Sequence, residues 1–247
     1  MKRIVIVGAT SAIAEHCARI WVTNSSIRLT LVGRDEGRLG TLQADLSVRS
    51  PNSIIDIETL DFEDPIAIAA LADRSVSDGD IDIVLIAHGN LPNQQACEQD
   101  LVLVSAVLAI NGLSPALFAE AFAAKFALAN HGTIALIGSV AGDRARRANY
   151  VYGAAKALIA HYGAGLQHRF AETEVKIVLI KPGPTATPMT ADLQAQGRRL
   201  AQADRVAASI VRAIDKGQSV VYTPAIWRFI MFVVRILPQG IFNKLKA

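Results

Sequence analysis

The chain has 247 residues, a net charge of +3 and 51% hydrophobic residues, which suits one α/β domain with a large core. Its two cysteines, Cys17 and Cys97, form neither a disulfide framework nor a metal-binding pattern, so we expect a reducing, cytoplasmic compartment and no metal site. The chain begins with a strand-like run, so we expect no signal peptide, and we expect no apolar stretch of the roughly 18 residues that span a bilayer.

The positive charge is concentrated at the C-terminus. Residues 225–247 contain Arg228, Arg235, Lys244 and Lys246 and no acidic residue, so they carry +4, which leaves −1 of the total of +3 for residues 1–224. The chain therefore divides into a near-neutral body, residues 1–224, and a basic tail, residues 225–247. The body has no basic face with interleaved aromatic residues, which argues against nucleic-acid binding.

Short apolar runs alternate with helical stretches along the whole body. Strands are predicted at 3–7, 28–32, 54–60, 81–86, 133–138, 176–181 and 219–222, and helices near 12–22, 36–48, 65–75, 99–129, 151–171 and 203–216. This alternation predicts a doubly wound α/β fold, a Rossmann-type parallel sheet of about seven strands with helices on both faces. Ligands of such folds bind at the carboxyl ends of the strands.

The first predicted strand runs into Gly8-Ala-Thr-Ser-Ala-Ile-Ala14 and then into a helix. A strand, a tight turn and a helix N-terminus together place backbone N–H groups where a pyrophosphate can bind. A plain strand-to-helix turn has the same composition, so this motif depends on the residues that follow it. The predicted cofactor contacts in the turn are Gly8, Thr10, Ser11, Ala12 and Ile13.

The second predicted strand ends at Gly33-Arg34-Asp35. A carboxylate at this point binds the ribose diol of NAD, whereas an arginine favours the 2′-phosphate of NADP. Arg34 can grip that phosphate bidentately and stack on the adenine, while we expect Asp35 to point away or to begin the next helix. We therefore favour NADP(H) as the cofactor, with NAD(H) as the alternative and a solvated loop arginine as the simplest other interpretation.

Tyr152 and Lys156 lie four residues apart in a predicted helix and so share one face. An ammonium beside a phenol favours the phenolate, so we expect Lys156 to lower the pKa of Tyr152 from its usual value of about 10. Ser139, thirteen residues upstream, can hold a carbonyl oxygen while Tyr152 gives it a proton. Tyr150 has no lysine four residues on, and we expect it in the wall of the substrate pocket.

These motifs resemble the short-chain dehydrogenase/reductase superfamily from residue 1 to about residue 222. The family's catalytic Asn, Ser, Tyr and Lys match Asn111, Ser139, Tyr152 and Lys156 in order and spacing. The resemblance implies NAD(P)-dependent interconversion of a ketone and a secondary alcohol in a homodimer or homotetramer, with Asn111 anchoring a water that links Lys156 to solvent. It also implies cofactor contacts by Asp61, Phe62, Ala87, His88, Gly89, Tyr152, Lys156, Pro182, Gly183, Thr185 and Thr187.

The chain departs from the family's pattern in two places. Ala12 and Ala14 stand at the second and third glycines of the usual TGxxxGxG turn, and we expect their methyl groups to push a pyrophosphate slightly outward. The usual NNAG after the fourth strand is Ala87-His88-Gly89 here. We expect His88 to shape the floor of the cofactor site rather than to act in catalysis.

Two features concern the substrate. Arg144, Arg146 and Arg147 lie between Ser139 and Tyr152, where they can bind a phosphate or pyrophosphate; a solvated loop or a subunit contact is the alternative. Residues 225–237 form an apolar segment between two prolines, with Trp227 near one end. As a helix this segment suits a membrane interface, with the tryptophan at headgroup depth, or equally an oligomer interface or the core.

Together, the segment from Gly142 to Lys156 and the apolar tail are similar to bacterial reductases of a decaprenylphosphoryl-2-keto-pentose. This narrower resemblance implies a lipid-phosphate-linked keto-sugar substrate for cell-envelope polysaccharide synthesis, and an enzyme held peripherally on the inner face of the cytoplasmic membrane. Because a fold does not fix a substrate, a soluble ketone such as a 3-oxoacyl thioester is the main alternative. A non-catalytic NADP-binding protein of the same fold is a further alternative, but such a protein typically lacks the Tyr, Lys or Ser.

Overall fold

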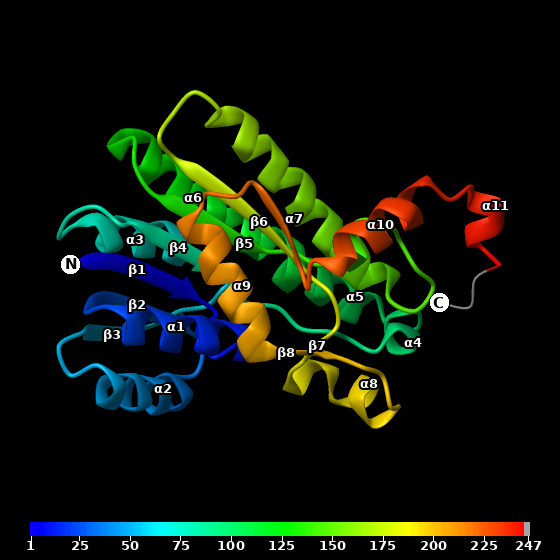
Figure 1. Cartoon of the computed structure of the whole chain (residues 1–247), viewed down its shortest axis with the longest axis horizontal. Coiled ribbons are helices and arrows are strands. Elements are labelled where there is room, and N and C mark those ends of the chain that lie inside the picture. The colour runs from blue at the N-terminus through cyan, green and yellow to red at the C-terminus, as the bar shows by residue number, and fades with distance from the viewer. Residues whose placement is uncertain (245–247) are drawn as a thin grey trace.

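The computed structural model, which describes residues 1–244, has a seven-stranded parallel sheet at its centre (Figure 1). The strand order is β3-β2-β1-β4-β5-β6-β9, so the sheet is doubly wound, with its first strand in the middle. The strands are β1 (Lys2–Val7), β2 (Ile27–Gly33), β3 (Ile54–Thr59), β4 (Ile83–Ile86), β5 (Thr133–Ile137), β6 (Lys176–Pro182) and β9 (Val220–Thr223). The predicted fold class and all seven predicted strands are confirmed.

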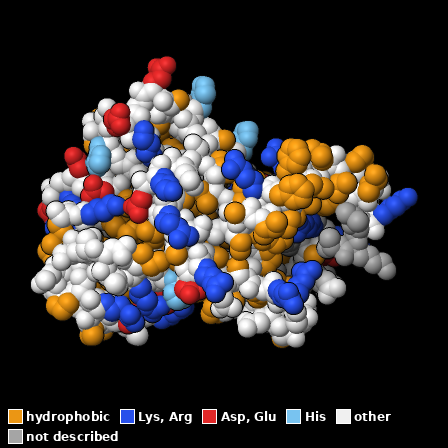
Figure 2. All heavy atoms as spheres, viewed as in Figure 1, with side chains coloured by type: hydrophobic (Ala, Val, Ile, Leu, Met, Phe, Trp, Pro, Cys, Tyr) orange, Lys and Arg blue, Asp and Glu red, His pale blue; other side chains and the backbone are white. Residues whose placement is uncertain are grey.

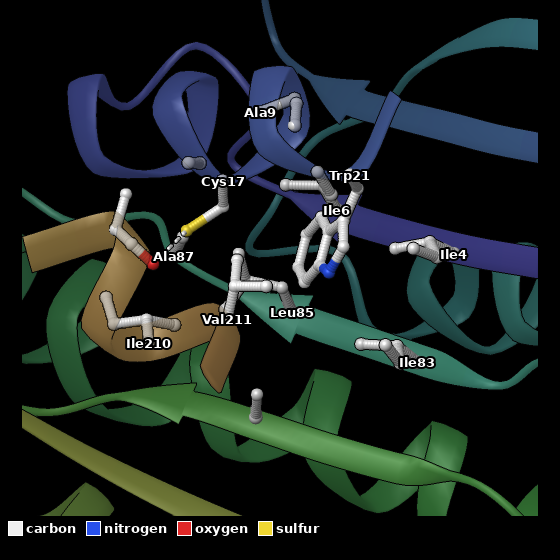
Figure 3. Close-up of a cluster of buried hydrophobic side chains, with 14 of the residues drawn as sticks. Ile4, Ile6, Ala9, Cys17, Trp21, Ile83, Leu85, Ala87, Ile210 and Val211 are labelled. Carbon is white, nitrogen blue, oxygen red and sulfur yellow. Dashed lines mark hydrogen bonds between the residues drawn. The ribbon is translucent and has the colours of Figure 1, made fainter. Parts of the chain in front are cut away.

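Helices cover both faces of the sheet, as expected for parallel strands. One face packs against α1 (Ala12–Asn24), α2 (Glu36–Arg49) and α9 (Ala203–Asp215), and the other against α3 (Pro65–Val76), α6 (Ser114–Ala129) and α7 (Tyr150–Arg169). Residues of β1 alternate between the two cores. Ile4 and Ile6 lie in the first core, shown in Figure 3, and Val5 and Val7 in the second.

Cys17 lies in the first core, where Figure 3 shows it between α1 and α9. Its side chain is fully buried, and this burial raises the pKa of its thiol, so it serves as a packing residue. Cys97 is also buried and free. The shorter elements all lie outside the main sheet: α4 (Gln94–Cys97), η2 (Val140–Gly142), β7 (Thr185–Ala186), η3 (Pro188–Thr190), α8 (Ala191–Ala195) and β8 (Ala201–Gln202).

The helical stretch from Leu101 to Ala129 corrects one expectation. It comprises α5 (Leu101–Leu108), the π-helical turn η1 (Ala109–Leu113) and α6, and its 29 residues are long and apolar enough to cross a membrane. The expectation that no such stretch exists was wrong, because residues 101–118 contain no charged residue and the few polar ones among them hardly lower the mean hydropathy. In the fold, 44% of its most apolar window is buried inside the protein, with three phenylalanines of α6 in the core.

The tail forms α10 (Ile226–Ile236) and α11 (Gln239–Phe242), which extend from one end of the molecule in Figure 1. Met231, on the inner side of α10, is fully buried. Trp227 packs against Gly183 so closely that a Cβ at Gly183 would lie 2.0 Å from the indole nitrogen. The expectation of Trp227 at headgroup depth is therefore wrong, because its ring contacts the protein. The predicted contribution of Lys246 lies outside the described residues.

Arg144 holds the tail in place. Its guanidinium donates to the carbonyl oxygens of Val234 and Leu237, at the end of α10, and to Gln239 Oε1 at 3.0 Å. The same guanidinium lies 3.9 Å from the centroid of the Phe242 ring. These donors satisfy carbonyl groups that a helix end leaves without partners. Arg144 is therefore engaged by the tail, which corrects its predicted place in a phosphate site.

Candidate active site

A cavity of about 1300 Å³ opens at the carboxyl ends of the strands. It is lined by nearly all the residues predicted from the sequence: Gly8, Thr10, Ser11, Ala12, Ile13, Arg34, Phe62, Ala87, His88, Gly89, Asn111, Ser139, Tyr152, Lys156, Pro182, Gly183, Thr185 and Thr187. Of the predicted catalytic residues and cofactor contacts, Asp61 is the exception. It is exposed outside the lining, and its carboxylate accepts a hydrogen bond from the Glu63 backbone N–H at 2.9 Å.

The turn after β1 has the geometry of an anion cradle. Gly8 has a φ of +80°, and a Cβ there would lie 2.6 Å from the backbone nitrogen of His88, so only glycine fits. The Gly8 and Ala9 N–H groups both donate to Val32 O, at 2.9 and 3.0 Å. The Ser11 side chain does not cap the helix that follows. The first N–H groups of α1, at Ala12 and Ile13, are thus left to face the cavity, where they fit a pyrophosphate.

Two arginines lie where the second strand ends. The Arg34 guanidinium is 6.0 Å from the centroid of the Phe62 ring, and Arg38 donates to Thr10 O at 3.2 Å. Asp35 caps α2 by accepting from the Arg38 N–H at 3.0 Å, which confirms that it begins the next helix. The sequence analysis missed Arg38, although its spacing of four residues from Arg34 could have indicated a second cation on the same side.

His88 is buried and neutral on the floor of the cavity. Ser114 donates its hydroxyl hydrogen to Phe62 O at 2.6 Å, so its oxygen accepts from His88 Nε2 at 2.9 Å. His88 Nδ1 is consequently an unprotonated acceptor, and it has no partner within the described chain. Burial, with smaller contributions from Lys156 and Arg34, lowers the pKa of His88 to about 3. This agrees with the expected role of shaping the floor.

Asn111 lies in the π-helical turn, fully buried. Its amide nitrogen donates to Asn90 Oδ1 at 2.8 Å and to Val107 O at 3.0 Å, and its oxygen accepts from the Asn90 N–H at 2.9 Å. A π-bulge commonly marks a functional position, because it re-aims one side chain without ending the helix. Here the bulge places the Asn111 side chain so that its hydrogen bonds to Asn90 hold the loop after β4 in place. Asn90 was missed by the sequence analysis.

Tyr152 and Lys156 lie on the buried side of α7. Lys156 Nζ donates to Ile137 O at 3.1 Å and lies 5.7 Å from the centroid of the Tyr152 ring. Burial raises the pKa of Tyr152 to about 12, with the Ser139 hydroxyl acting in the opposite direction. Burial also lowers the pKa of Lys156 to about 8. The expectation that the pKa of Tyr152 lies below its usual value is therefore wrong, because desolvation of the phenol dominates the net shift.

The loop between Ser139 and Tyr152 is held by a buried carboxylate. Asp143 forms an ion pair with Lys181 of β6 and accepts from the Tyr222 hydroxyl of β9 at 2.7 Å. Arg146 and Arg147, which lie further along the same loop, line the cavity. Tyr150 is 42% exposed and lies outside the lining, so the expectation that it forms the pocket wall was wrong.

Three further polar residues that line the cavity were missed by the sequence analysis: Gln94 of α4, Asn149 and Arg198. None of them belongs to a spacing that indicates a site. Within the described residues no group of three or more His, Cys, Asp or Glu side chains could hold a metal ion.

Comparison with known proteins places the site in context. The family model described as short chain dehydrogenase matches residues 2–198. An uncharacterized oxidoreductase in the mprA 5′ region of Streptomyces coelicolor is 28% identical, covering 99% of this chain and 96% of its own length. An uncharacterized oxidoreductase of Mycobacterium tuberculosis is 27% identical, covering 98% of this chain and 96% of its own length.

Solved structures share the whole fold. A short-chain dehydrogenase from Sphingobium yanoikuyae, in complex with NADPH, superimposes with a TM-score of 0.83 at 22% identity, covering 100% of this chain and 97% of that chain. An actinorhodin polyketide ketoreductase variant with NADPH gives 0.80 at 20% identity, covering 90% and 95%. At these identities the likeness establishes the fold.

The buried neutral state of His88 predicts a pH-dependent loss of stability. The unfolded chain binds a proton at His88 below about pH 6.5, whereas the folded chain does not until about pH 3. The contribution is therefore fully present above pH 6.5 and falls by about 1.4 kcal/mol per pH unit below it. In His88→Gln, the free energy of unfolding, measured by urea denaturation from neutral pH down into this window, should fall less steeply with pH than that of wild type. The difference in slope should be about 1.4 kcal/mol per pH unit. His168→Gln, at an exposed histidine, should parallel wild type; equal slopes for all three proteins would contradict the assignment.

Proposed function

Since the chain belongs to the short-chain dehydrogenase family and is an NAD(P)-dependent oxidoreductase, we propose that it uses NADPH to reduce a ketone to a secondary alcohol. The observation that carries this proposal is one cavity with a nucleotide cradle at one end and Asn111, Ser139, Tyr152 and Lys156 at the other.

The chain offers a place for each part of the cofactor. The N–H groups at the start of α1 fit the pyrophosphate, and the Pro182–Thr187 loop fits the nicotinamide side. Arg34 and Arg38 fit a 2′-phosphate, while the nearest acid, Asp35, is committed to capping α2. This division favours NADPH over NADH. When bound, the nicotinamide supplies the hydride that the carbonyl carbon receives.

The chain's own residues supply the proton and the positioning. Burial keeps Tyr152 protonated at neutral pH, so its hydroxyl is ready to donate to the carbonyl oxygen as reduction proceeds. Ser139 orients that oxygen, and the Lys156 ammonium beside the ring stabilises the phenolate left behind. In oxidation the same groups act in reverse, with Tyr152 as the base.

We assign the substrate to the lipid-phosphate-linked keto-sugars used in cell-envelope polysaccharide synthesis. Two features support this class: arginines at the substrate end of the cavity, and an exposed apolar helix that borders the same end through Met231 and Arg146. A soluble ketone such as a 3-oxoacyl thioester would need neither feature. All four catalytic side chains line the cavity, which argues against a non-catalytic NADP-binding protein. The expected homodimer or homotetramer stays a prediction.

The outer face of α10 suits an anionic membrane surface on the cytoplasmic side. Phe229 and Phe232 are 66% and 61% exposed, and Ile226, Val233 and Ile236 extend the same apolar face. Figure 2 shows hydrophobic side chains gathered over α10 and α11, with Lys and Arg side chains around them. Arg228, Arg235 and Lys244 are exposed, and the tail contains no acid, so its charge complements anionic headgroups.

Removing the proton donor should abolish turnover and spare cofactor binding. Tyr152→Phe should lower the rate of NADPH oxidation, measured with any ketone the wild type reduces, by about 10²–10⁴-fold. Its NADPH dissociation constant, followed by cofactor fluorescence, should stay close to that of wild type. Tyr150→Phe is the matched control, since Tyr150 lies two residues before Tyr152 and outside the cavity lining. It should keep full activity. Undiminished turnover in Tyr152→Phe would refute the mechanism.

Cofactor choice should depend on the two arginines after β2. Arg34→Ala and Arg38→Ala each remove a charged partner of the 2′-phosphate, which is typically worth about 1.5–3 kcal/mol, or roughly ten- to a hundredfold in affinity. The dissociation constant of NADPH should rise by that factor and that of NADH by much less. Arg212→Ala, at an exposed arginine of α9, should change neither. An equal loss for both cofactors would overturn the preference.

The tail should bind anionic vesicles through its apolar face. In the double variant Phe229→Glu and Phe232→Glu, sedimentation with phosphatidylglycerol vesicles should fall at least tenfold, because two acids replace exposed apolar rings. Leu128→Glu, at a still more exposed leucine of α6, should bind like wild type. Absence of vesicle binding by wild type, together with a dimer that the double variant breaks, would assign the face to a second copy of the chain instead.

A further inference from the structure

Three buried polar atoms near Tyr152 have no hydrogen-bond partner within the described chain. They are Gln94 Nε2, Arg146 Nε and Asn149 Oδ1, and all three residues line the cavity. A buried polar atom without a partner costs roughly 1–3 kcal/mol, so native proteins rarely retain one without a reason. Three such atoms at the substrate end of one cavity indicate a ligand that completes their hydrogen bonds.

Gln94 is fixed next to the reacting groups. It is only 8% exposed, and its Oε1 accepts from the Val151 N–H at 3.2 Å, one residue before Tyr152. This bond holds the amide by its oxygen and leaves the Nε2 hydrogens as donors. Asn149, just before α7, contributes an acceptor. A donor and an acceptor on residues that line the same cavity match a sugar hydroxyl, which both accepts and donates a hydrogen bond.

Arg146 carries an uncompensated charge at the same place. Its Nη2 contacts Met231 Sδ at 3.6 Å, and a thioether is a weak acceptor. Arg147 lines the cavity next to Arg146, and Arg198 approaches from the segment after α8. Burial together with the charge of Arg198 lowers the pKa of Arg146. Glu98 and Asp192 also line the cavity, yet no acid within residues 1–244 forms an ion pair with Arg146 or Arg198.

We propose that Gln94, Arg146, Asn149 and Arg198 form a subsite for a phosphorylated sugar group of the substrate. Guanidinium groups bind phosphate oxygens in a bidentate manner, and one phosphate between two arginines would satisfy Arg146 Nε and relieve the repulsion between the two cations. The amides of Gln94 and Asn149 bind the hydroxyl groups. This assignment rests on the proposed reductase function, and it names the residues that hold the phosphate and the hydroxyl groups of the proposed substrate.

The test measures binding without turnover. With the protein saturated with NADP⁺, calorimetric titrations compare ribose 5-phosphate and farnesyl phosphate with their unphosphorylated counterparts, ribose and farnesol. Each phosphate compound should bind at least tenfold more tightly than its counterpart. Arg146→Met and Arg198→Met should each weaken phosphate binding by about tenfold or more, as expected for a charge-assisted contact. Arg146→Lys should recover part of the loss, because it keeps the charge and loses the fork.

Arg199→Met is the matched control, since Arg199 is exposed next to Arg198 but does not line the cavity. It should bind the phosphate probes like wild type, and unchanged NADPH affinity shows that each variant is folded. Tight binding of farnesyl phosphate alone supports a lipid-linked source, and equal binding of ribose 5-phosphate supports a soluble one.

Equal phosphate binding by the Arg146, Arg198 and Arg199 variants would overturn the subsite, as would equal affinity for phosphorylated and unphosphorylated probes. A chain that binds phosphate through Arg146 but reduces no ketone would refute the reductase and retain the subsite. A chain that reduces ketones but shows no arginine-dependent phosphate binding would refute the subsite alone.

Discussion

The buried ion pair between Asp143 and Lys181 organises the substrate side of this protein. The Asp143 side chain is 3% exposed, so its charge must be compensated locally, and Lys181 and the Tyr222 hydroxyl do so from β6 and β9. A buried pair of this kind gives little net stability, but losing either partner costs about 3–5 kcal/mol, so the geometry is strongly fixed. The loop between Ser139 and Tyr152 is thereby held against two strand ends. Its arginines are also divided, with Arg144 turned to the tail and Arg146 to the cavity.

Burial, more than pairing, sets the protonation states around the reacting centre. It raises the pKa of Tyr152, lowers that of Lys156 and lowers that of His88. In each case the neutral form is favoured, as expected where water is excluded. The Tyr152 phenol therefore holds its proton at neutral pH, and a positive charge beside its ring, such as the Lys156 ammonium, makes that proton easier to give to a carbonyl oxygen. The electrostatic character of the site thus follows from how deeply α7 is packed against the end of β5.

The sequence predicted the fold and most of the cavity lining for a physical reason. Parallel strands buried on both faces appear as short apolar runs, and their carboxyl ends meet at one edge, so motifs that follow the strands converge. The predictions that failed concern residues whose behaviour depends on how deeply they are buried or on partners that are distant in the sequence. The pKa of Tyr152 was misjudged because the spacing to Lys156 reports proximity and not desolvation. Arg144 and Trp227 were misplaced because the tail's contacts span some 90 and 44 residues of chain, and no local pattern encodes them. Gln94 was missed because its role rests on burial.

The tail connects the outer surface of the molecule with both sides of the active site. Its inner side contacts Gly183, in the loop predicted to face the nicotinamide, through Trp227, and contacts Arg146 through Met231. Its outer side presents exposed phenylalanines. Because opposite sides of α10 make these two sets of contacts, the helix need not detach from the body to meet a surface. A lipid-linked substrate anchored in that surface would then enter the cavity past Arg146. The Arg146 guanidinium, which contacts Met231 of α10, lies on that route.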